Sequence, residues 1–181
     1  RAGYNAGFKI VRDMINDKAF KAYIDKGLNE EIIKTIDLDE NELKAFANSV
    51  IERFNNPFID HKLLDISLNS VAKFKARCLC SLLDYYNKFG KIPSVLSFAF
   101  AALINFYENF ENKDYPVNDV ESVLHFFKAK HNDIVFDVLA NVGFWGEDLT
   151  KIDGLYKKVK AYFDDIKSLG ISKAMEKLLD E

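Results

Sequence analysis

The chain has 181 residues, of which 49% are hydrophobic and 14% are aromatic. A chain of this length can bury one sizeable core, and its apolar content excludes an intrinsically disordered protein. The net charge of −3 provides no basic excess, so no nucleic-acid partner is expected.

Two further features concern the compartment. Cys78 and Cys80 stand two positions apart, where a helix points their side chains in different directions, so no disulfide framework is expected. This is typical of a reducing cytoplasm, where we expect the protein to be located. The longest uncharged run, residues 92–107, is shorter than the ~20 residues that cross a bilayer. It predicts a buried core helix and no contact with a membrane.

Apolar residues recur at helical spacing from the beginning of the chain. The first stripe predicts a helix that stops at Gly27, and residues 28–36 predict a short second helix. Asp39 stands three positions before Glu42, which is a capping-box spacing and predicts the start of a third helix. The first stripe contains Phe8, Val11, Ile15, Phe20 and Ile24, and the third helix would bury Leu43, Phe46, Val50, Ile51 and Phe54.

The middle of the chain predicts three helices. Asp60 can cap a short helix over residues 61–68, and Ser70 can cap a longer one that stops at Gly90. Pro93 opens the apolar core helix, which would end near Asn109. On the second of these helices the predicted buried stripe is Val71, Phe74, Cys78 and Leu82.

The last third predicts a surface loop at residues 111–116, followed by helices at 118–130, 132–142, 152–169 and 171–180. There is no convincing period-2 strand and no internal repeat. The predicted fold class is therefore all-α, an irregular bundle of about eight to ten helices that forms one domain over residues 1–181.

Asn69, Lys73 and Arg77 are spaced i, i+4, i+8, which places them along one side of a helix. Two cations on one line, with no acid between them, suit the binding of a carboxylate. Taken alone, however, such a pattern more often marks a solvated basic face. His61 precedes this segment and is a weaker candidate for contact with a ligand.

Other chemistry finds little support. The histidines have no metal-ligand spacing and the cysteines lack partner ligands, so no metal site is predicted. The chain contains no G-x-G-x-x-G, and it therefore carries no dinucleotide-binding fingerprint of its own.

The run from Glu52 to Pro57, E-R-F-N-N-P, is followed by L-N-S-V-A-K-F-K-A-R at residues 68–77. These two motifs resemble the mannitol dehydrogenase family of polyol and uronate dehydrogenases, most closely its tagaturonate reductase (altronate oxidoreductase) branch. The core helix 93–107 and residues 6–13 are also similar to the family, so the resemblance covers roughly residues 6–110.

In that family a Rossmann domain binds NAD and a helical C-terminal domain completes the active site. The resemblance thus implies that Lys73 lies near a bound uronate or polyol, and that Asn69, Ser70 and Arg77 read the carboxylate of a uronate. The mannitol branch has an Arg where this chain has Asp65, so that contact should differ. The implied reaction is a metal-independent reduction of D-tagaturonate to D-altronate by NADH.

One family motif is absent. The catalytic K-x-x-x-x-N-x-x-H, which in the family lies just upstream of the segment matching Ala6-Gly7, does not occur here. We therefore expect the chain to be only the substrate-side domain, without catalytic residues of known role and unable to transfer hydride alone. Its expected partners are the small-molecule substrate and its own N-terminal Rossmann domain. Without that domain, an exposed apolar face could cause self-association.

Two alternatives stay open. The chain could be the same domain of an enzyme for a neutral polyol such as mannitol, or of a fructuronate-type enzyme. It could instead be a stand-alone helical module that binds a protein partner through an apolar groove. The latter gives no reason for Asn69, Ser70, Lys73 and Arg77 to follow an Asn-Asn-Pro turn.

Overall fold

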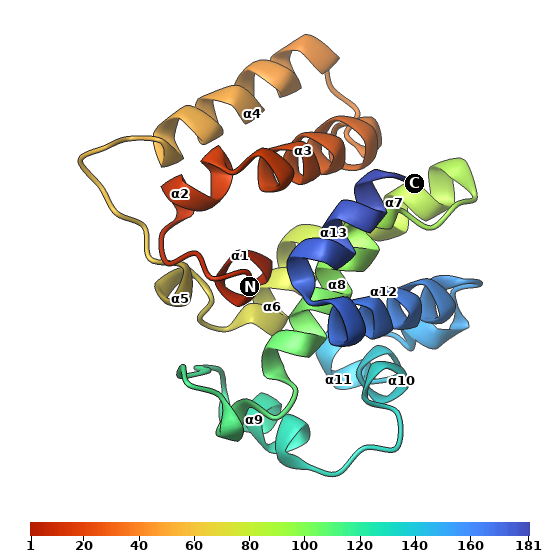
Figure 1. The fold of residues 1–181 in the computed structure, drawn as a ribbon. Helices are drawn as coiled ribbons and strands as arrows, with labels where there is room; N and C mark the ends of the chain where they lie inside the picture. Colours follow the sequence, from red (N-terminus) through yellow and green to blue (C-terminus); the bar gives the residue numbers. More distant parts are fainter.

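The structure, a computed structural model, describes all 181 residues and consists of helices and loops (Figure 1). The only strand-like pairing is an isolated antiparallel bridge between Ile10 and Lys62. The prediction of an all-α bundle is confirmed. No helix combines the length and the apolar character that crossing a bilayer requires.

The first half of the chain contains α1 (Ala2–Asn5), α2 (Val11–Asn16), α3 (Lys18–Lys26), η1 (Gly27–Ile32), η2 (Ile33–Thr35), α4 (Glu40–Phe54), α5 (Leu63–Ile66), α6 (Ser70–Phe74), η3 (Lys75–Leu79) and α7 (Cys80–Phe89). The second half contains α8 (Ser94–Tyr107), η4 (Phe110–Asn112), α9 (Glu121–Lys128), α10 (Ile134–Leu139), α11 (Val142–Trp145), η5 (Leu149–Lys151), α12 (Leu155–Leu169) and α13 (Ile171–Leu179).

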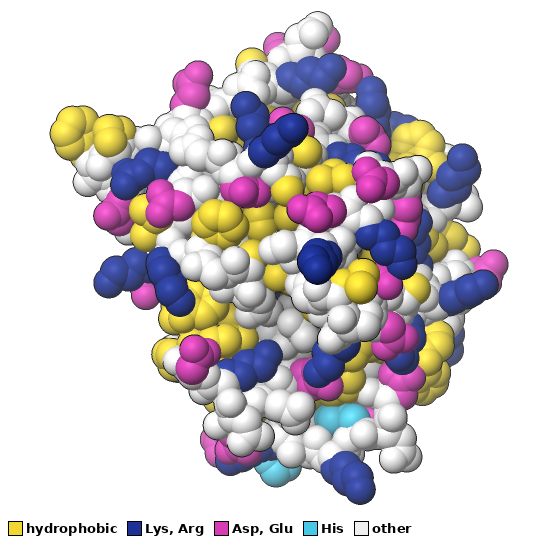
Figure 2. All heavy atoms as spheres, in the orientation of Figure 1, with side chains coloured by type: hydrophobic (Ala, Val, Ile, Leu, Met, Phe, Trp, Pro, Cys, Tyr) yellow, Lys and Arg dark blue, Asp and Glu magenta, His cyan; other side chains and the backbone are white.

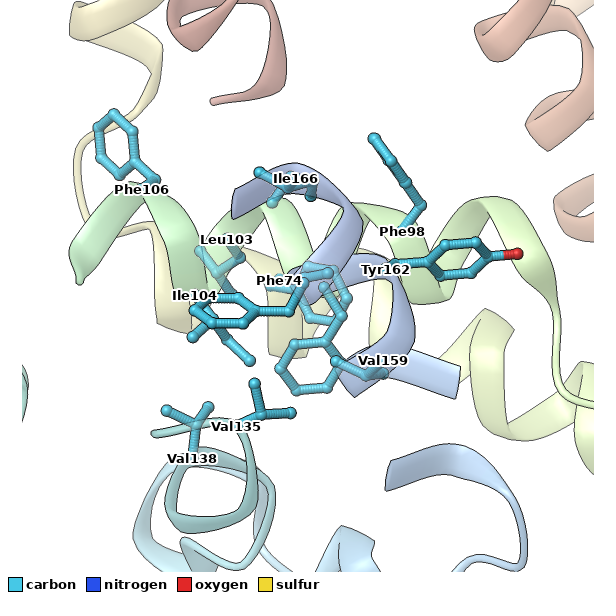
Figure 3. Close-up of a cluster of buried hydrophobic side chains, with 14 of the residues drawn as sticks. Phe74, Phe98, Leu103, Ile104, Phe106, Val135, Val138, Val159, Tyr162 and Ile166 are labelled. Carbon is cyan, nitrogen blue, oxygen red and sulfur yellow. The ribbon is translucent and has the colours of Figure 1, made fainter. Parts of the chain in front are cut away.

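The core is built around α8, the predicted apolar helix. Eleven of its 14 residues are buried, because α12, α13, α10 and α6 pack around it. Figure 3 shows Leu103 and Ile104 of α8 facing side chains from three other helices. These neighbours are Phe74 of α6, Val135 and Val138 of α10, and Val159 and Ile166 of α12, while Tyr162 of α12 packs against Phe98 with ring centroids 5.7 Å apart. The burial of so many apolar side chains is the main stabilising contribution in this fold.

The prediction of one helix from Phe8 to a stop at Gly27 is wrong in two places. Asp17 interrupts the run because its carboxylate accepts the N–H groups of Ala19 and Phe20, at 3.0 Å each, and so caps α3. Gly27 has helical φ and ψ, and the chain continues through it as a wider π-helical turn. This glycine lies against α8: a Cβ at its position would stand 2.7 Å from Cγ1 of Val95.

Helix α4 begins as predicted, with Asp39 accepting the N–H groups of Asn41 and Glu42. The expected burial of its stripe is wrong, since α4 has no buried residue and Phe46 is 69% exposed. Figure 1 shows α4 set apart from the central helices, alongside α2 and α3. The stripe faces an apolar groove of about 480 Å³, lined by hydrophobic side chains of α2, α3, η1, η2 and α4 and by Ile66 of α5.

The segment around the two motifs also departs from expectation. Asp60 does not cap a helix; it forms an ion pair with Arg12 at 2.8 Å, and α5 begins only at Leu63. The helix from Ser70 to Phe89 is interrupted by the π-helical turn η3. A π turn pairs backbone groups five residues apart instead of four. The buried stripe therefore continues from Phe74 to Leu79, and Cys78 is only partly buried. The predicted stop at Gly90 is confirmed, with φ of 64°.

The last third forms the layer that covers α8. Helices α9, α10, α12 and α13 lie within the predicted ranges, and Asp133 caps α10 by accepting from Val135 and Phe136. Residues Val142–Trp145 form the short helix α11, and Gly146 ends it with φ of 92°. Trp145 is buried there and donates from Nε1 to the carbonyl of Val138 at 2.6 Å.

Candidate binding site at the Asn69 turn

The predicted site residues surround a sharp turn between α5 and α6. Asn69 has φ of 52° and ψ of 50°, the left-handed backbone conformation that, apart from glycine, is adopted mainly by asparagine and aspartate. Its N–H donates to the carbonyl of Asn118 at 3.1 Å, and its own carbonyl accepts the N–H of Lys73 at 3.1 Å. The turn therefore starts α6 and is attached to the loop that precedes α9.

Ser70 follows the turn and is fully buried, with an exposed fraction of 0%. Its hydroxyl donates to the carbonyl of Ser67, and its backbone carbonyl accepts from Nη2 of Arg1 at 3.3 Å. In this structure the Ser70 side chain therefore holds the α5–α6 connection. The sequence-based prediction that it contacts a substrate stays a prediction.

Lys73 lies one turn along the helix, where its side chain is partly buried. Its ammonium donates to the carbonyl of Ile66 at 3.0 Å and has no carboxylate partner. The ammonium is thus folded back over the end of α5 rather than extended into solvent. A cation held in this way keeps donor capacity for a further oxygen ligand, since an ammonium has three N–H groups.

Arg77 is exposed on η3 and makes no ion pair. The guanidinium of Arg1 lies close enough to interact electrostatically with both Arg77 and Cys78. Burial lowers the pKa of the Arg1 guanidinium and raises the pKa of the Cys78 thiol. The Nε atom of Arg1 is buried without a hydrogen-bond partner. Sequence reasoning missed Arg1, because nothing in its local pattern places it beside η3.

His61 and Asp65 complete the set of positions named from sequence. His61 is partly buried and stacks edge-on against Phe54, with ring centroids 5.3 Å apart. Its backbone carbonyl accepts the N–H of Val11 at 2.9 Å, so the residue joins the Asn-Asn-Pro turn to α2. Asp65 is exposed on α5 and forms no ion pair.

The turn also rests on two residues that the sequence did not identify. The hydroxyl of Tyr107, the last residue of α8, accepts the N–H of Ser70 at 3.0 Å and donates to the carboxylate of Asp119. Tyr107 has an exposed fraction of 0%, and burial together with Asp119 raises its pKa. Tyr107 therefore keeps its proton at neutral pH. The only signal in the sequence was an apolar helix that ends in a tyrosine.

A polar hollow of about 450 Å³ lies beside α1 and is lined by Tyr4, Asn5, Lys9, Lys113 and Tyr115 among others. Neither Lys73 nor Arg77 lines it. No group of three or more His, Cys, Asp or Glu side chains is placed to hold a metal ion. Figure 2 shows basic and acidic side chains interspersed over the face that it presents.

The candidate site comprises the Asn69 turn, Lys73 and Arg77, with Arg1 close to Arg77. Three of these side chains are cations, and no carboxylate forms an ion pair with any of them. Such an arrangement can attract and orient a small anion. It contains no nucleophile with an adjacent base, so by itself it offers binding rather than bond-making chemistry.

Comparison with known proteins adds the family. The profile of the "Mannitol dehydrogenase C-terminal domain" matches residues 1–167. Altronate oxidoreductase of Yersinia pestis bv. Antiqua (strain Nepal516) is 37% identical over 183 residues, covering 95% of this chain and 38% of that protein. Altronate oxidoreductase of Klebsiella pneumoniae (strain 342) is 39% identical over 184 residues, covering 96% and 38%. The chain therefore spans about two-fifths of the length of these curated relatives.

Two solved structures share the fold. Mannitol 2-dehydrogenase of Pseudomonas fluorescens, in a ternary complex with NAD and D-mannitol, matches with a TM-score of 0.84 and 16% identity. The match covers 99% of this chain and 37% of that one. D-sorbitol dehydrogenase in a substrate-free form matches with a TM-score of 0.76 and 20% identity, covering 96% and 36%. At these identities the likeness establishes the fold alone.

Proposed function

The chain belongs to the mannitol dehydrogenase C-terminal domain family, and we propose that it is the substrate-side domain of an NAD-dependent uronate oxidoreductase. The proposed reaction is the reduction of D-tagaturonate to D-altronate. Its support is the identity of 37% to 39% with altronate oxidoreductases across nearly the whole chain. The residue motifs at 52–57 and 68–77 point to the same branch.

The cofactor would be bound outside these 181 residues. The chain has no parallel sheet and no G-x-G-x-x-G motif, the features from which a Rossmann dinucleotide site is built. We propose that a Rossmann domain of the same enzyme binds NAD and supplies the Lys, Asn and His of the catalytic motif. By this proposal the chain alone does not catalyse hydride transfer.

The single observation that carries the proposal is the cationic face at Lys73 and Arg77 beside the Asn69 turn. Lys73 is held against Ile66 with donor capacity left, and Arg77 is free of acidic partners. We assign these two cations to the carboxylate and nearby hydroxyl oxygens of a uronate, where charge-assisted hydrogen bonds are strongest. The amide of Asn69 and the imidazole of His61 are proposed as further contacts, and Ser70 as support for the turn.

A second candidate is a neutral polyol or a fructuronate-type substrate. It remains a candidate because the family match is to the mannitol dehydrogenase C-terminal domain as a whole. Asp65, which stands where the mannitol branch has an Arg, argues for the uronate instead. A stand-alone interaction module is the least favoured reading, because the family match extends over residues 1–167.

The deciding experiment is an NADH-oxidation assay of the full-length enzyme that carries this chain, with tagaturonate, fructuronate and fructose as separate substrates. We expect kcat/KM for tagaturonate to exceed that for fructose by about 100-fold or more, since lost charge-assisted hydrogen bonds cost about 1.5–3 kcal/mol each. Equal activity on fructose, or activity on fructose alone, would replace the uronate with the neutral polyol.

A further inference from the structure

The left-handed turn at Asn69 is held by the end of α8 and the loop before α9, which are remote in sequence. Among residues other than glycine, asparagine adopts the left-handed conformation more readily than most, but its side chain alone does not fix it there. The side chain of Asn69 provides no cap of its own for α6. The hydrogen bonds that reach the turn from outside therefore hold the conformation that asparagine permits.

Two of these bonds come from adjacent residues of one loop. The carbonyl of Asn118 accepts the N–H of Asn69 at 3.1 Å, and the carboxylate of Asp119 accepts the hydroxyl proton of Tyr107. The Tyr107 oxygen is then free to accept the N–H of Ser70 at 3.0 Å. The hydrogen bonds therefore run in one direction, from the Ser70 N–H to the Tyr107 hydroxyl and from that hydroxyl to the Asp119 carboxylate. Hydrogen bonds in such a chain polarise and strengthen one another.

The Ser70 N–H is one of the unpaired donors in the first turn of α6, and Tyr107 supplies the acceptor that the local sequence lacks. Lys73 depends on the same turn, because its backbone N–H donates to the carbonyl of Asn69 at 3.1 Å. The direction in which Lys73 projects is therefore set by the path of residues 69 and 70, and Arg77 follows on the π-helical turn η3, which continues from α6.

We propose that Tyr107 and Asp119 are positioning residues, which fix the Asn69 turn and thereby aim the cationic face of Lys73 and Arg77 at the substrate carboxylate. This inference rests on the proposed function and assigns the last third of the chain a part in substrate recognition. Tyr107 has an exposed fraction of 0%, so it acts through the turn and not by touching the substrate.

The test uses the full-length enzyme with Tyr107→Phe. The matched control is Tyr162→Phe, because Tyr162 is also buried and its hydroxyl donates to a carboxylate, that of Glu181 at 2.8 Å, in a part of the core away from the turn. We expect Tyr107→Phe to raise KM for tagaturonate by about 10-fold with a smaller change in kcat, since misplaced binding groups are costly. Tyr162→Phe should leave KM within about twofold.

Two substitutions of Asp119 provide a second test of the positioning role. Asp119→Asn keeps an oxygen that can accept the Tyr107 proton and should retain near-normal KM, whereas Asp119→Ala should raise KM as Tyr107→Phe does. A KM that rises equally in Tyr107→Phe and Tyr162→Phe, or in neither, overturns the proposal. A merely structural role predicts lost stability in both tyrosine variants without a KM difference between them.

Amide hydrogen exchange of the same variants separates this inference from the proposed function, because it requires no substrate. Tyr107→Phe should accelerate exchange in residues 69–77 by about 10-fold relative to the wild type, while Tyr162→Phe should not. Unchanged exchange in this segment rejects the positioning role even if tagaturonate is the substrate. Accelerated exchange in an enzyme inactive on tagaturonate supports the role and rejects the substrate.

Discussion

The carboxylate of Glu31 accepts the backbone N–H of Val95 at 2.7 Å, and its other oxygen accepts that of Leu96 at 2.8 Å. Glu31 lies on η1, and the two N–H groups open the central helix α8, whose N-cap position is Pro93. Proline offers no side-chain acceptor, so these donors depend on a carboxylate from 64 residues away. The start of the core helix is thereby joined to the N-terminal segment.

The first prediction follows from this contact. Glu31→Ala should lower the free energy of unfolding by about 1–3 kcal/mol, because it leaves buried N–H donors without an acceptor. Glu30→Ala removes an exposed neighbour and should change the stability by about 0.5 kcal/mol or less. Urea denaturation of both variants measures the difference. Equal effects would show that water replaces the Glu31 carboxylate without cost.

The second prediction concerns pH. Burial raises the pKa of Glu31 in the folded chain above its ordinary value of 4.5. The folded state therefore binds this proton more tightly, so the contribution to stability is complete below the unfolded pKa and is lost as the pH rises through the folded pKa. Glu31→Gln does not titrate. The stability of the wild type relative to this variant should fall as the pH rises above the ordinary glutamate pKa of 4.5.

Thermal unfolding of both proteins across this range is the measurement. Buffers of constant ionic strength keep surface pairs, such as Lys34–Glu40, from contributing differently at each pH. A difference that stays flat, or that grows with pH in favour of the wild type, would mean that the two N–H donors stabilise the carboxylate more than burial penalises it.

Much of the fold followed from local sequence patterns, and the errors have one physical cause. Asp39 and Gly90 act on their own helices, and both predictions were right. The environments of Asp60 and Gly27 depend on residues far along the chain, which no local pattern reveals. Asp60 pairs with Arg12, and Gly27 lies against Val95. The burial of the α4 stripe failed likewise, because helical spacing identifies an apolar face but not whether another element closes over it.

The site shows the same division. The spacing of Asn69, Lys73 and Arg77 predicts one shared helix side, and the resemblance to a family predicts their role; both stay predictions, and the π-helical turn η3 begins between Lys73 and Arg77. The positive φ of Asn69 was not predicted: asparagine permits it, but the bonds that hold the turn come from a tyrosine and a loop 37 or more residues away. Because of the π-helical turn, Leu79 is buried where regular helical spacing predicts Cys78. A prediction from 3.6-residue periodicity cannot anticipate such a turn.

The third prediction separates two reasons for glycine. Gly27→Ala places a Cβ 2.7 Å from Cγ1 of Val95, and overpacking of this kind costs about 1–3 kcal/mol. Gly90→Ala meets no atom within 4 Å but requires φ of +64°, at a cost of about 1–2 kcal/mol. In a Val95→Ala background, Gly27→Ala should cost less stability than it does in the wild type, whereas the cost of Gly90→Ala should be unchanged. Additive effects at Gly27 and Val95 would remove the steric explanation.

The fourth prediction divides the two roles of Asn69. Asn69→Gly fits the left-handed turn and should leave the stability within about 0.5 kcal/mol, whereas Asn69→Ala should cost about 1 kcal/mol. If the amide contacts the substrate, both variants of the full-length enzyme should raise KM for tagaturonate. Asn109, the other residue besides the glycines with a positive φ, provides the control: Asn109→Gly should leave KM unchanged. Wild-type KM in Asn69→Gly would leave Asn69 a backbone role only.

The last prediction addresses the cations. In the full-length enzyme, Lys73→Met and Arg77→Met should each raise KM for tagaturonate by about 10- to 100-fold, because a charge-assisted hydrogen bond contributes about 1.5–3 kcal/mol and each 1.4 kcal/mol is tenfold. The effect of Arg77→Met on fructose should be small, since fructose has no carboxylate. Lys75→Met is the matched control, as Lys75 lies on the same helical run but packs toward Gly146.

The pH profile of kcat gives a second readout for Lys73. A catalytic Lys in the partner domain would have its pKa lowered by a cation nearby, so removing the charge of Lys73 should shift the basic limb of the profile to higher pH. Lys75→Met should not shift it. If Lys73→Met leaves both the profile and KM for tagaturonate at their wild-type values, Lys73 lies outside the site and the carboxylate must be read elsewhere.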